Sequence, residues 1–309
     1  MDEAVEWADA QLTRHGAART GPIEEMRVRP WSSTWRVPTE LGTLWLKTCG
    51  PGGRYEAALQ GLLSVVAPEW VLQPVAVDAA RGWLLLPDGG PTLDKTLAGA
   101  APEVRVERWC SVLAEYAELQ RRLVAFVPDL LGVGVPDLRP GASSALFRDL
   151  VSTCTEPPLR DRLDAFAPTV DEAAERLVAT GLPPTVQHDD FHSSNVCCGD
   201  DGLGPPAFID WGDALVAHPM GTLLVTCRVL ARELDVEVED PLLRRLVDAY
   251  LEPWTIEFAR SDLLAQLDDV LVLAKVGRAW GWLRALQGAT PDQQATWDNP
   301  VAAWLEQLL

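Results

Sequence analysis

The feature that most restricts the fold is a change of hydrophobic pattern near residue 90 of the 309-residue chain. Before it, short runs rich in β-branched and aromatic residues alternate with turn residues, which is typical of strands. After it, apolar residues recur with a helical period over most of the chain. The sequence therefore predicts an α+β protein with a small sheet-containing lobe at residues 1–90 and a larger, mostly helical lobe at residues 91–309.

The predicted order of elements in the first lobe is helix, three strands, helix, two strands. The strands are expected at residues 23–31, 33–39, 43–49, 70–78 and 82–87. An amphipathic helix is expected at residues 3–14, and a second one at residues 54–67, after the breaker Gly50–Gly53. The segment Pro87–Pro91 (PDGGP) is predicted to link the two lobes.

The second lobe is predicted to be helical around a small β-type island. Helices are expected at residues 102–126, 159–180, 220–233, 240–254, 259–286 and 292–308. The island comprises residues 185–198 and 206–213. Both of its segments also contain polar residues that suggest a chemical function.

The formal net charge of −19 argues against a nucleic-acid partner, which requires a basic face. The acidity fits a cationic small substrate, and it fits equally a surface charge that only keeps the protein soluble. No apolar run approaches the roughly 20 residues of a membrane span, and the acidic N-terminus lacks a signal-peptide pattern. We therefore expect a cytoplasmic protein that binds neither nucleic acid nor membrane.

The six cysteines do not suggest a metal or redox centre, because none of them forms a C-x-x-C pair. Cys197 and Cys198 are adjacent in the chain, an arrangement that rarely forms a disulfide without strain. We expect all six to act as small apolar residues in a reduced compartment.

The strongest chemical signal is the segment His188-Asp189-Asp190-Phe191-His192-Ser193-Ser194-Asn195, which is followed by an apolar run ending in Asp210. Phosphoryl transfer from ATP requires a carboxylate that accepts the proton of the attacking hydroxyl. It also requires oxygen ligands that hold Mg²⁺ against the phosphates. Asp190 suits the role of base, and Asn195 and Asp210 suit the role of Mg²⁺ ligands.

The alternative is that this motif is a surface turn and that Asp210 merely ends a buried strand. Two considerations favour the functional interpretation. The chain has only four histidines, so an H-x-D with a correctly placed asparagine is uncommon by chance. A carboxylate at the end of a core strand is also costly to bury without a partner or a metal.

A second signal lies upstream, where Lys47 stands in the otherwise apolar run TLWLKT and Glu56 follows in a predicted helix. A lysine that emerges from a strand can reach ATP phosphates, and a helix glutamate can fix its position. Taken alone, each residue is more simply a solvated charge. Together with the Asp190 motif, their order predicts a kinase-like nucleotide site.

These motifs resemble those of the aminoglycoside phosphotransferase family, which is related to choline, fructosamine and homoserine kinases. HDDFHSSNV resembles the family's H-G-D-L-H-P-G-N-V, FIDWGDA resembles I-D-W-E-x-A, and WLKT resembles its lysine strand. LLLPDGGPTL resembles its hinge, so Asp88 and Gly89 are implied at the nucleotide. The resemblance spans about residues 22–235. It implies a bilobal protein-kinase-like fold, ATP, Mg²⁺ and transfer to a small-molecule hydroxyl.

Three departures from the family pattern bear on the site. Asp189 replaces the usual glycine, so it is expected to alter the choice of acceptor or to raise the pKa of Asp190 by like-charge repulsion. The first strand turn is RPWSSTW rather than glycine-rich, and Ser32 and Ser33 are expected to offer backbone N–H groups or hydroxyls to the phosphates. Thr222 stands where a structural aspartate is usual.

Other residues are candidates for the acceptor side of the site. His192 is expected to contact the γ-phosphate or the acceptor, or else to hydrogen-bond within its loop. Asp213 is the candidate acidic group that faces the acceptor. Trp254, Trp280 and Trp282 lie on the late helices, where they could stack a ring or hold a cation. Packing in the helical core is the simpler explanation for each tryptophan.

The sequence thus favours a kinase that phosphorylates a hydroxyl of a small polar molecule. An aminoglycoside or similar amino-sugar fits, with a role in antibiotic resistance, and so does a choline-like alcohol or a sugar with a metabolic role. The alternative is a catalytically weak, nucleotide-binding regulatory protein with a kinase fold. The joint presence of Lys47, Asp190, Asn195 and Asp210 argues against it. Protein kinase activity is disfavoured because no A-P-E element follows Asp210 and the segment there is too short for a long activation loop.

Overall fold

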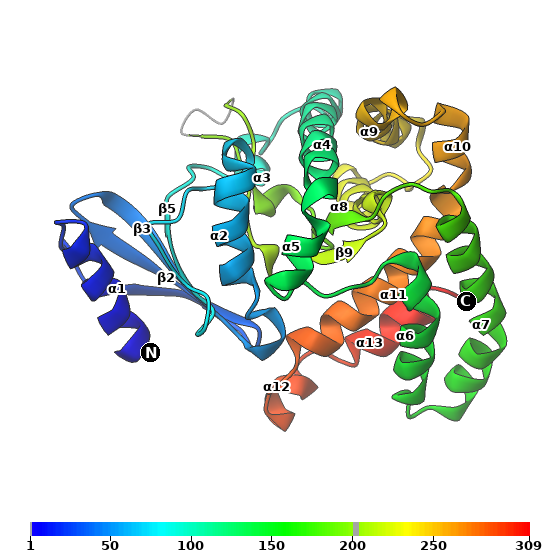
Figure 1. The fold of residues 1–309 in the computed structure, drawn as a ribbon, viewed down its shortest axis with the longest axis horizontal. Coiled ribbons are helices and arrows are strands. Elements are labelled where there is room, and N and C mark those ends of the chain that lie inside the picture. The colour runs from blue at the N-terminus through cyan, green and yellow to red at the C-terminus, as the bar shows by residue number, and fades with distance from the viewer. Residues whose placement is uncertain (1, 200–203) are drawn as a thin grey trace.

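The computed structural model describes residues 2–199 and 204–309 and divides them into two lobes (Figure 1). The small lobe contains a five-stranded antiparallel sheet with the strand order β1-β2-β3-β5-β4. The strands are β1 (Glu24–Val28), β2 (Ser32–Thr39), β3 (Gly42–Cys49), β4 (Ala76–Asp78) and β5 (Trp83–Pro87). The predicted bilobal α+β architecture is confirmed, whereas the exact division at residue 90 stays a prediction.

Helix α1 (Asp2–Arg14) covers one face of this sheet, and α2 (Glu56–Val66) lies on the side of the larger lobe (Figure 1). The alternation of side chains along a strand explains the arrangement. Leu44 and Leu46 of β3 are buried and pack with Trp7 of α1 in one hydrophobic cluster. Lys47, the next residue, therefore points from the opposite face of the sheet, toward α2 and the second lobe.

The sheet is smaller than the sequence pattern suggested. Strand β1 ends at Val28, before Pro30, which has no N–H group to donate to a ladder. The strand predicted at residues 70–78 is reduced to β4, and Pro68–Trp70 forms a 3₁₀ turn instead. Pro74 lies within that run, and it limits pairing in the same way.

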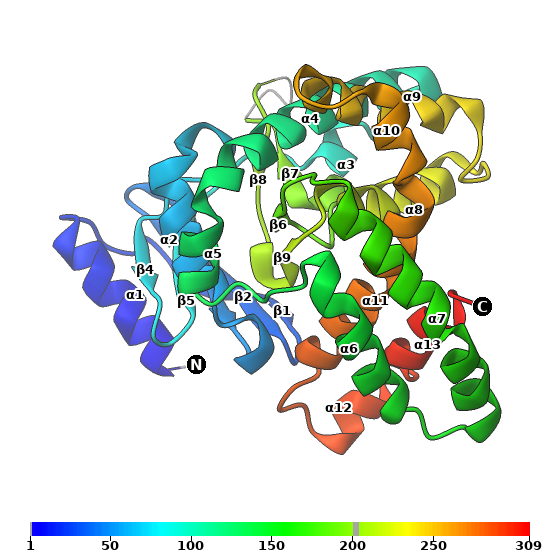
Figure 2. The same cartoon turned by 45° about the vertical axis from the view of Figure 1, so that its right-hand side comes forward.

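The large lobe is helical around two short strand pairs. Its helices are α3 (Leu93–Thr96), α4 (Pro102–Leu123), α5 (Val127–Gly132), α6 (Pro140–Ser152), α7 (Pro157–Ala179), α8 (Leu223–Leu234), α9 (Pro241–Leu251), α10 (Arg260–Ala265), α11 (Leu267–Ala285), α12 (Pro291–Ala295) and α13 (Pro300–Glu306). Strand β6 (Thr185–Gln187) pairs with β9 (Leu215–Ala217), and β7 (Val196–Cys197) pairs with β8 (Ala207–Phe208). Figure 2 shows α6, α7, α11 and α13 grouped at the end of the molecule away from α1.

Three details of the helical lobe correct the sequence prediction. The helix expected at residues 259–286 is divided at Gln266 into α10 and α11. The helix expected at residues 292–308 is divided into α12 and α13, because Asp298 and Asn299 adopt positive φ angles before Pro300. Helix α6 was not predicted, since its first turns contain a glycine and two serines rather than an apolar stripe.

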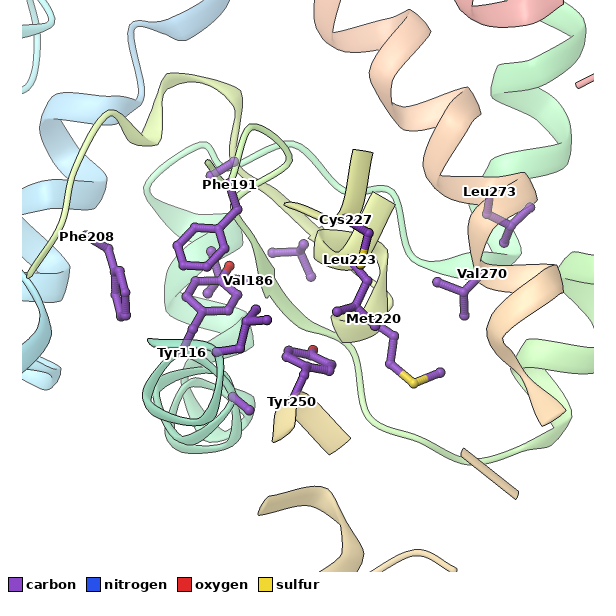
Figure 3. Close-up of a cluster of buried hydrophobic side chains, with 14 of the residues drawn as sticks. Tyr116, Val186, Phe191, Phe208, Met220, Leu223, Cys227, Tyr250, Val270 and Leu273 are labelled. Carbon is purple, nitrogen blue, oxygen red and sulfur yellow. The ribbon is translucent and has the colours of Figure 1, made fainter. Parts of the chain in front are cut away.

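The core of the large lobe includes the aromatic residue of the H-x-D motif. Figure 3 shows Phe191 against Tyr116, with Phe208 beside them. The rings of Phe191 and Tyr116 stack with centroids 4.2 Å apart, and the Phe191 and Phe208 centroids are 5.4 Å apart. Trp254 is also part of this core, as the simpler explanation required. Packing of Phe191 in this core therefore fixes the position of the loop that carries the H-x-D motif, which we call the motif loop.

Within the described residues, no helix is both long enough and apolar enough to span a bilayer.

Gln120 of α4 is a buried hydrogen-bonding junction, and its replacement tests the core. Its side-chain amide donates to the carbonyl oxygens of Val186 and Pro219 at 2.8 and 3.1 Å, and Tyr250 donates to its carbonyl oxygen. We expect Gln120→Leu to lower the free energy of unfolding by about 2–4 kcal/mol, because three buried groups lose their partners. Denaturant titration measures the change. The same substitution at exposed Gln287 is the control, and an equal loss there would contradict this role.

Candidate active site

The site is centred on the amino group of Lys47, which joins both lobes. Its Nζ donates to Glu56 Oε1 of α2 and to Asp210 Oδ1, both at 2.6 Å. The lysine side chain is 10% exposed and that of Glu56 is 4% exposed. Burial opposes the charge on the amino group, but Asp210 and Glu56 outweigh it and raise the pKa of Lys47. Three residues predicted from separate motifs are thus brought together by direct contacts.

Asp210 follows β8 in a left-handed conformation with a φ of 63°. Hydrogen-bonding contacts at its N–H and at its carbonyl fix the backbone of the preceding residue, Ile209. The Ile209 N–H donates to the Asn195 carbonyl at 3.0 Å, and His188 Nε2 lies 2.8 Å from the Ile209 carbonyl. Burial opposes ionisation, but Lys47 outweighs it and lowers the pKa of Asp210. The left-handed residue turns its carboxylate out of the strand, where its side chain is 31% exposed.

Asp190 lies near the start of the motif loop, residues 188–195, and a hydrogen bond fixes its backbone. Asn195 Nδ2 donates to the Asp190 carbonyl at 2.9 Å. The Asp190 Oδ2 atom lies 3.4 Å from His192 Nε2, and Oδ1 lies 3.2 Å from Arg278 Nη2. Burial opposes ionisation, but Arg278 and then His192 outweigh it and lower the pKa of Asp190. The carboxylate is therefore ionised near neutral pH and able to accept a proton.

Arg278 was not identified by sequence analysis. It lies in the middle of α11, and its guanidinium is within 4 Å of the carboxylates of Asp189, Asp190 and Asp213. Nothing in the local sequence VGRAWGW singles it out, because its partners lie more than 60 residues earlier in the chain. Arg284, one and a half turns later, donates to the backbone carbonyl of Asp213 at 3.3 Å.

The Asp189 side chain is turned into the protein and is only 1% exposed. Its Oδ1 accepts a hydrogen bond from Gln187 Nε2 at 2.8 Å, and Arg278 Nη1 lies 3.6 Å from Oδ2. Burial raises the pKa of Asp189 to about 8, against the opposing effect of Arg278. A carboxyl in this position reaches an acceptor only through its neighbours. Asp213, the other predicted acceptor-side acid, has a side chain that is 32% exposed.

The two serines of the first strand turn begin β2 rather than form the tip of the turn. Ser32 is buried and pairs with Cys49, and Ser33 pairs with Thr48. The tip is instead Pro30–Trp31. These serines therefore contribute backbone next to Lys47, and the hydroxyl of Ser32 has no partner among the described residues.

The tip of this turn is attached to the large lobe by an aromatic cluster. The ring centroid of Trp31 lies 5.7 Å from that of Trp282 in α11 and 4.9 Å from that of Trp297, between α12 and α13. The Trp282 and Trp297 centroids are 5.3 Å apart. We call Trp31, Trp282 and Trp297 the tryptophan cluster. Trp282 thus contacts the small lobe. Neither of the two interpretations from the sequence, a wall of the acceptor pocket or packing in the helical core, anticipated this contact.

Asp88 and Gly89 lie where β5 leaves the sheet. The Asp88 N–H donates to the Thr43 carbonyl at 3.2 Å, and the Asp88 side chain is exposed. A Cβ on Gly89 would lie 2.9 Å from the Sγ of Cys197. Only glycine permits this close approach of the linker to the large lobe. Both residues therefore lie between the lobes, as the hinge resemblance implies.

The oxygen atoms at the site suit a hard divalent cation such as Mg²⁺. Because Asn195 uses its amide nitrogen toward Asp190, its amide oxygen is left for another partner. Asp210 Oδ2 is contacted by Arg27 Nη2 at 3.3 Å, and that arginine side chain is 46% exposed. No cluster of three or more His, Cys, Asp or Glu side chains that could hold a metal is found within residues 2–199 and 204–309. The protein oxygens would thus supply part of the coordination shell.

Comparison with known proteins agrees with this geometry. A model of the phosphotransferase enzyme family matches residues 53–264, more than half of the chain. The chain belongs to this phosphotransferase family. The matched region includes Glu56, the motif loop and Asp210, but Lys47 lies before it. Membership identifies the protein as a phosphotransferase by family.

Three solved structures illustrate the shared fold. The GDP and kanamycin complex of APH(2")-IIia has a TM-score of 0.62 at 15% identity, covering 99% of this chain and 100% of that one. Macrolide 2'-phosphotransferase MphH from Brachybacterium faecium has a TM-score of 0.60 at 17% identity, covering 97% and 98%. A choline/ethanolamine kinase family protein from Mesorhizobium loti has a TM-score of 0.57 at 18% identity, covering 99% and 94%. A comparison with curated proteins finds no match.

The burial of Asp189 in this phosphotransferase predicts an unusual pH dependence of stability. The folded carboxyl keeps its proton up to about pH 8, whereas the unfolded one ionises from its ordinary value of 3.8. The unfolded state therefore gains stability as the pH rises between these values, by up to about 1.4 kcal/mol per pH unit. We expect Asp189→Asn to be more stable than the wild type at pH 8, with the difference shrinking toward pH 5.

Denaturant unfolding at several pH values measures this difference. Asp88→Asn, the same change at an exposed residue, is the matched control and should leave the pH dependence of the wild type intact. A wild type that becomes more stable than Asp189→Asn as the pH rises would show that Asp189 is ionised and paired with Arg278.

Proposed function

We propose that the protein transfers the γ-phosphate of ATP, with Mg²⁺, to a hydroxyl group of a small polar molecule in the cytoplasm. The observation that supports this best is the meeting of Lys47, Glu56 and Asp210 at 2.6 Å contacts, beside the loop that holds Asp190. The family match supports phosphoryl transfer in general. An amino-sugar such as an aminoglycoside, a choline-like alcohol and a sugar are the acceptor classes to test.

Each residue has a distinct role in the proposal. Lys47, fixed by Glu56, binds the triphosphate as a point charge. Asp210 and Asn195 hold Mg²⁺, which supplies the charge that neutralises the phosphates when bound. Asp190 accepts the proton of the acceptor hydroxyl, and His192 keeps its carboxylate oriented. The Ser32–Ser33 backbone and the linker at Asp88 and Gly89 form the nucleotide side of the site.

Two parts of this proposal have an alternative: the nucleotide that donates the phosphate, and the assignment of the protein as an active enzyme. Because APH(2")-IIia was solved with GDP, guanine nucleotides are the second donor to test. A catalytically weak, nucleotide-binding regulatory protein is the second candidate function. The contact of Arg27 with Asp210 Oδ2 favours it, since this arginine must release the carboxylate before a metal can bind there.

Asp190→Asn tests the base. We expect this variant to fold and to bind nucleotide, but to lose turnover by about 100- to 10,000-fold, because an amide cannot accept the hydroxyl proton. Release of nucleoside diphosphate across a panel of hydroxyl acceptors measures turnover, and calorimetry measures nucleotide binding. Asp292→Asn in exposed α12 is the matched control. Undiminished turnover in Asp190→Asn would remove this residue from the mechanism.

Asp210→Ala tests the metal site. The variant should lose the Mg²⁺ dependence of nucleotide binding, since one of two proposed protein ligands is missing. Titration of a fluorescent ATP analogue with and without Mg²⁺ measures this directly. Arg27→Ala is the informative control, because it frees Asp210 Oδ2 while keeping the ligand, and it should retain or strengthen the Mg²⁺ effect. Equal Mg²⁺ responses in wild type and Asp210→Ala would contradict the assignment.

A further inference from the structure

Helix α11 brings an unusually bare stretch of backbone against the acidic residues of the site. A Cβ on Gly281 would lie 3.4 Å from Asp189 Oδ2 and 3.6 Å from Asp213 Oδ1. A Cβ on Gly277 would lie 3.7 Å from Asp189 Oδ1. The two glycines are four residues apart and so share one helix face. The carboxylates can therefore approach the helix closely, and Arg278 lies among them.

Arg278 occupies the position from which a cation would contact these acids. Its Nη2 lies 3.2 Å from Asp190 Oδ1, and its Nη1 lies 3.8 Å from Asp213 Oδ2. The guanidinium is held in place, because Nη1 also donates to the Asp189 carbonyl at 2.8 Å and the residue is 8% exposed. An ammonium group of an acceptor would have to compete with this fixed charge for the same oxygen atoms.

The charges at the site nearly cancel, in contrast to the net charge of −19 of the whole chain. The carboxylates are those of Glu56, Asp189, Asp190, Asp210 and Asp213, and the cations are Arg27, Lys47, Arg278 and Arg284. Because burial raises the pKa of Asp189 to about 8, this carboxyl is neutral at pH 7, and the remaining four carboxylates balance the four cations. The two partly exposed acids Asp190, in the motif loop, and Asp213 both already contact Arg278.

We infer that Arg278 is a specificity-determining residue which makes the acceptor an uncharged hydroxyl compound, such as a neutral sugar or polyol, rather than a cationic amino-sugar or choline-like alcohol. This inference rests on the proposed function and narrows its acceptor classes. A guanidinium beside the reacting hydroxyl repels an ammonium group there, while it leaves a neutral hydroxyl compound free to approach Asp190.

Binding of kanamycin, a polycationic probe, tests the inference without requiring turnover. Calorimetry is done at about physiological ionic strength, which screens attraction to the acidic surface, with and without Mg²⁺ and a non-hydrolysable ATP analogue. We expect no saturable kanamycin binding to the wild type or to Arg278→Lys, which keeps the charge. Arg278→Gln should bind kanamycin saturably, at least about tenfold more tightly than the weakest binding that the wild-type titration would detect.

Lys275→Gln is the matched control, because it removes the same charge from the same helix at a residue whose amino group donates to the Gln307 carbonyl. It should bind kanamycin as poorly as the wild type. Micromolar binding of kanamycin by the wild type would overturn the inference, and so would equal binding by Arg278→Gln and Lys275→Gln. If Arg278→Gln does not fold, kanamycin binding by the wild type and by Arg278→Lys still tests the inference.

The nucleotide arm separates this inference from the proposed function. A wild type that binds neither ATP nor GTP analogues would refute the proposed function, whereas the kanamycin result without nucleotide would still report on Arg278. Conversely, tight kanamycin binding together with Mg²⁺-dependent nucleotide binding would uphold the phosphotransferase and overturn only the uncharged acceptor. Glucose and glucosamine then form a matched pair for turnover, since they differ in one amino group.

Discussion

The buried amino group of Lys47 connects the elements on which the site depends. It holds a sheet strand, helix α2 and the turn after β8 within hydrogen-bonding distance of one point. A buried lysine is tolerated only with partners, so Glu56 and Asp210 are necessary to the stability of the small lobe. The position of Lys47 depends in turn on the strand alternation that places Leu46 under α1. Packing on one face of the sheet therefore determines where the amino group of Lys47 lies on the other face.

The motif loop shows a similar division between core and site. Phe191 is packed against Tyr116 in the large core, while the side chain of the neighbouring Asp190 contacts Arg278 and stays partly exposed. Two aspartates, Asp189 and Asp210, adopt left-handed backbone conformations that cost energy for residues other than glycine. Both positions belong to the segments that contribute carboxyl groups to the site. The rigid core keeps them in place.

The sequence predicted those parts of the structure that depend on short-range patterns. The strand alternation around Lys47 and the spacing from His188 to Asn195 are local signals, and the structure brings these segments to one site. Arg278 could not be found in this way, because a lysine- or arginine-containing helix looks the same whether the charge faces water or three distant carboxylates. Likewise, the break between α12 and α13 depends on the positive φ of Asn299, which the apolar pattern does not record. The features that the sequence did not reveal are thus the ones that depend on contacts between distant segments or on backbone conformation.

The tryptophan cluster has a consequence for how the two lobes can move. Trp31 packs one end of the sheet against α11, whereas the linker at Gly89 lies close to Cys197 of the large lobe. A ligand that enters between the lobes would meet a strand turn that is not free to move, because Trp31 at its tip packs against Trp282 and Trp297. Any opening must pivot about the tryptophan cluster or pull its indole rings apart. Because indole emission responds to the ring's surroundings, these two modes of opening would leave different optical signatures in the same protein.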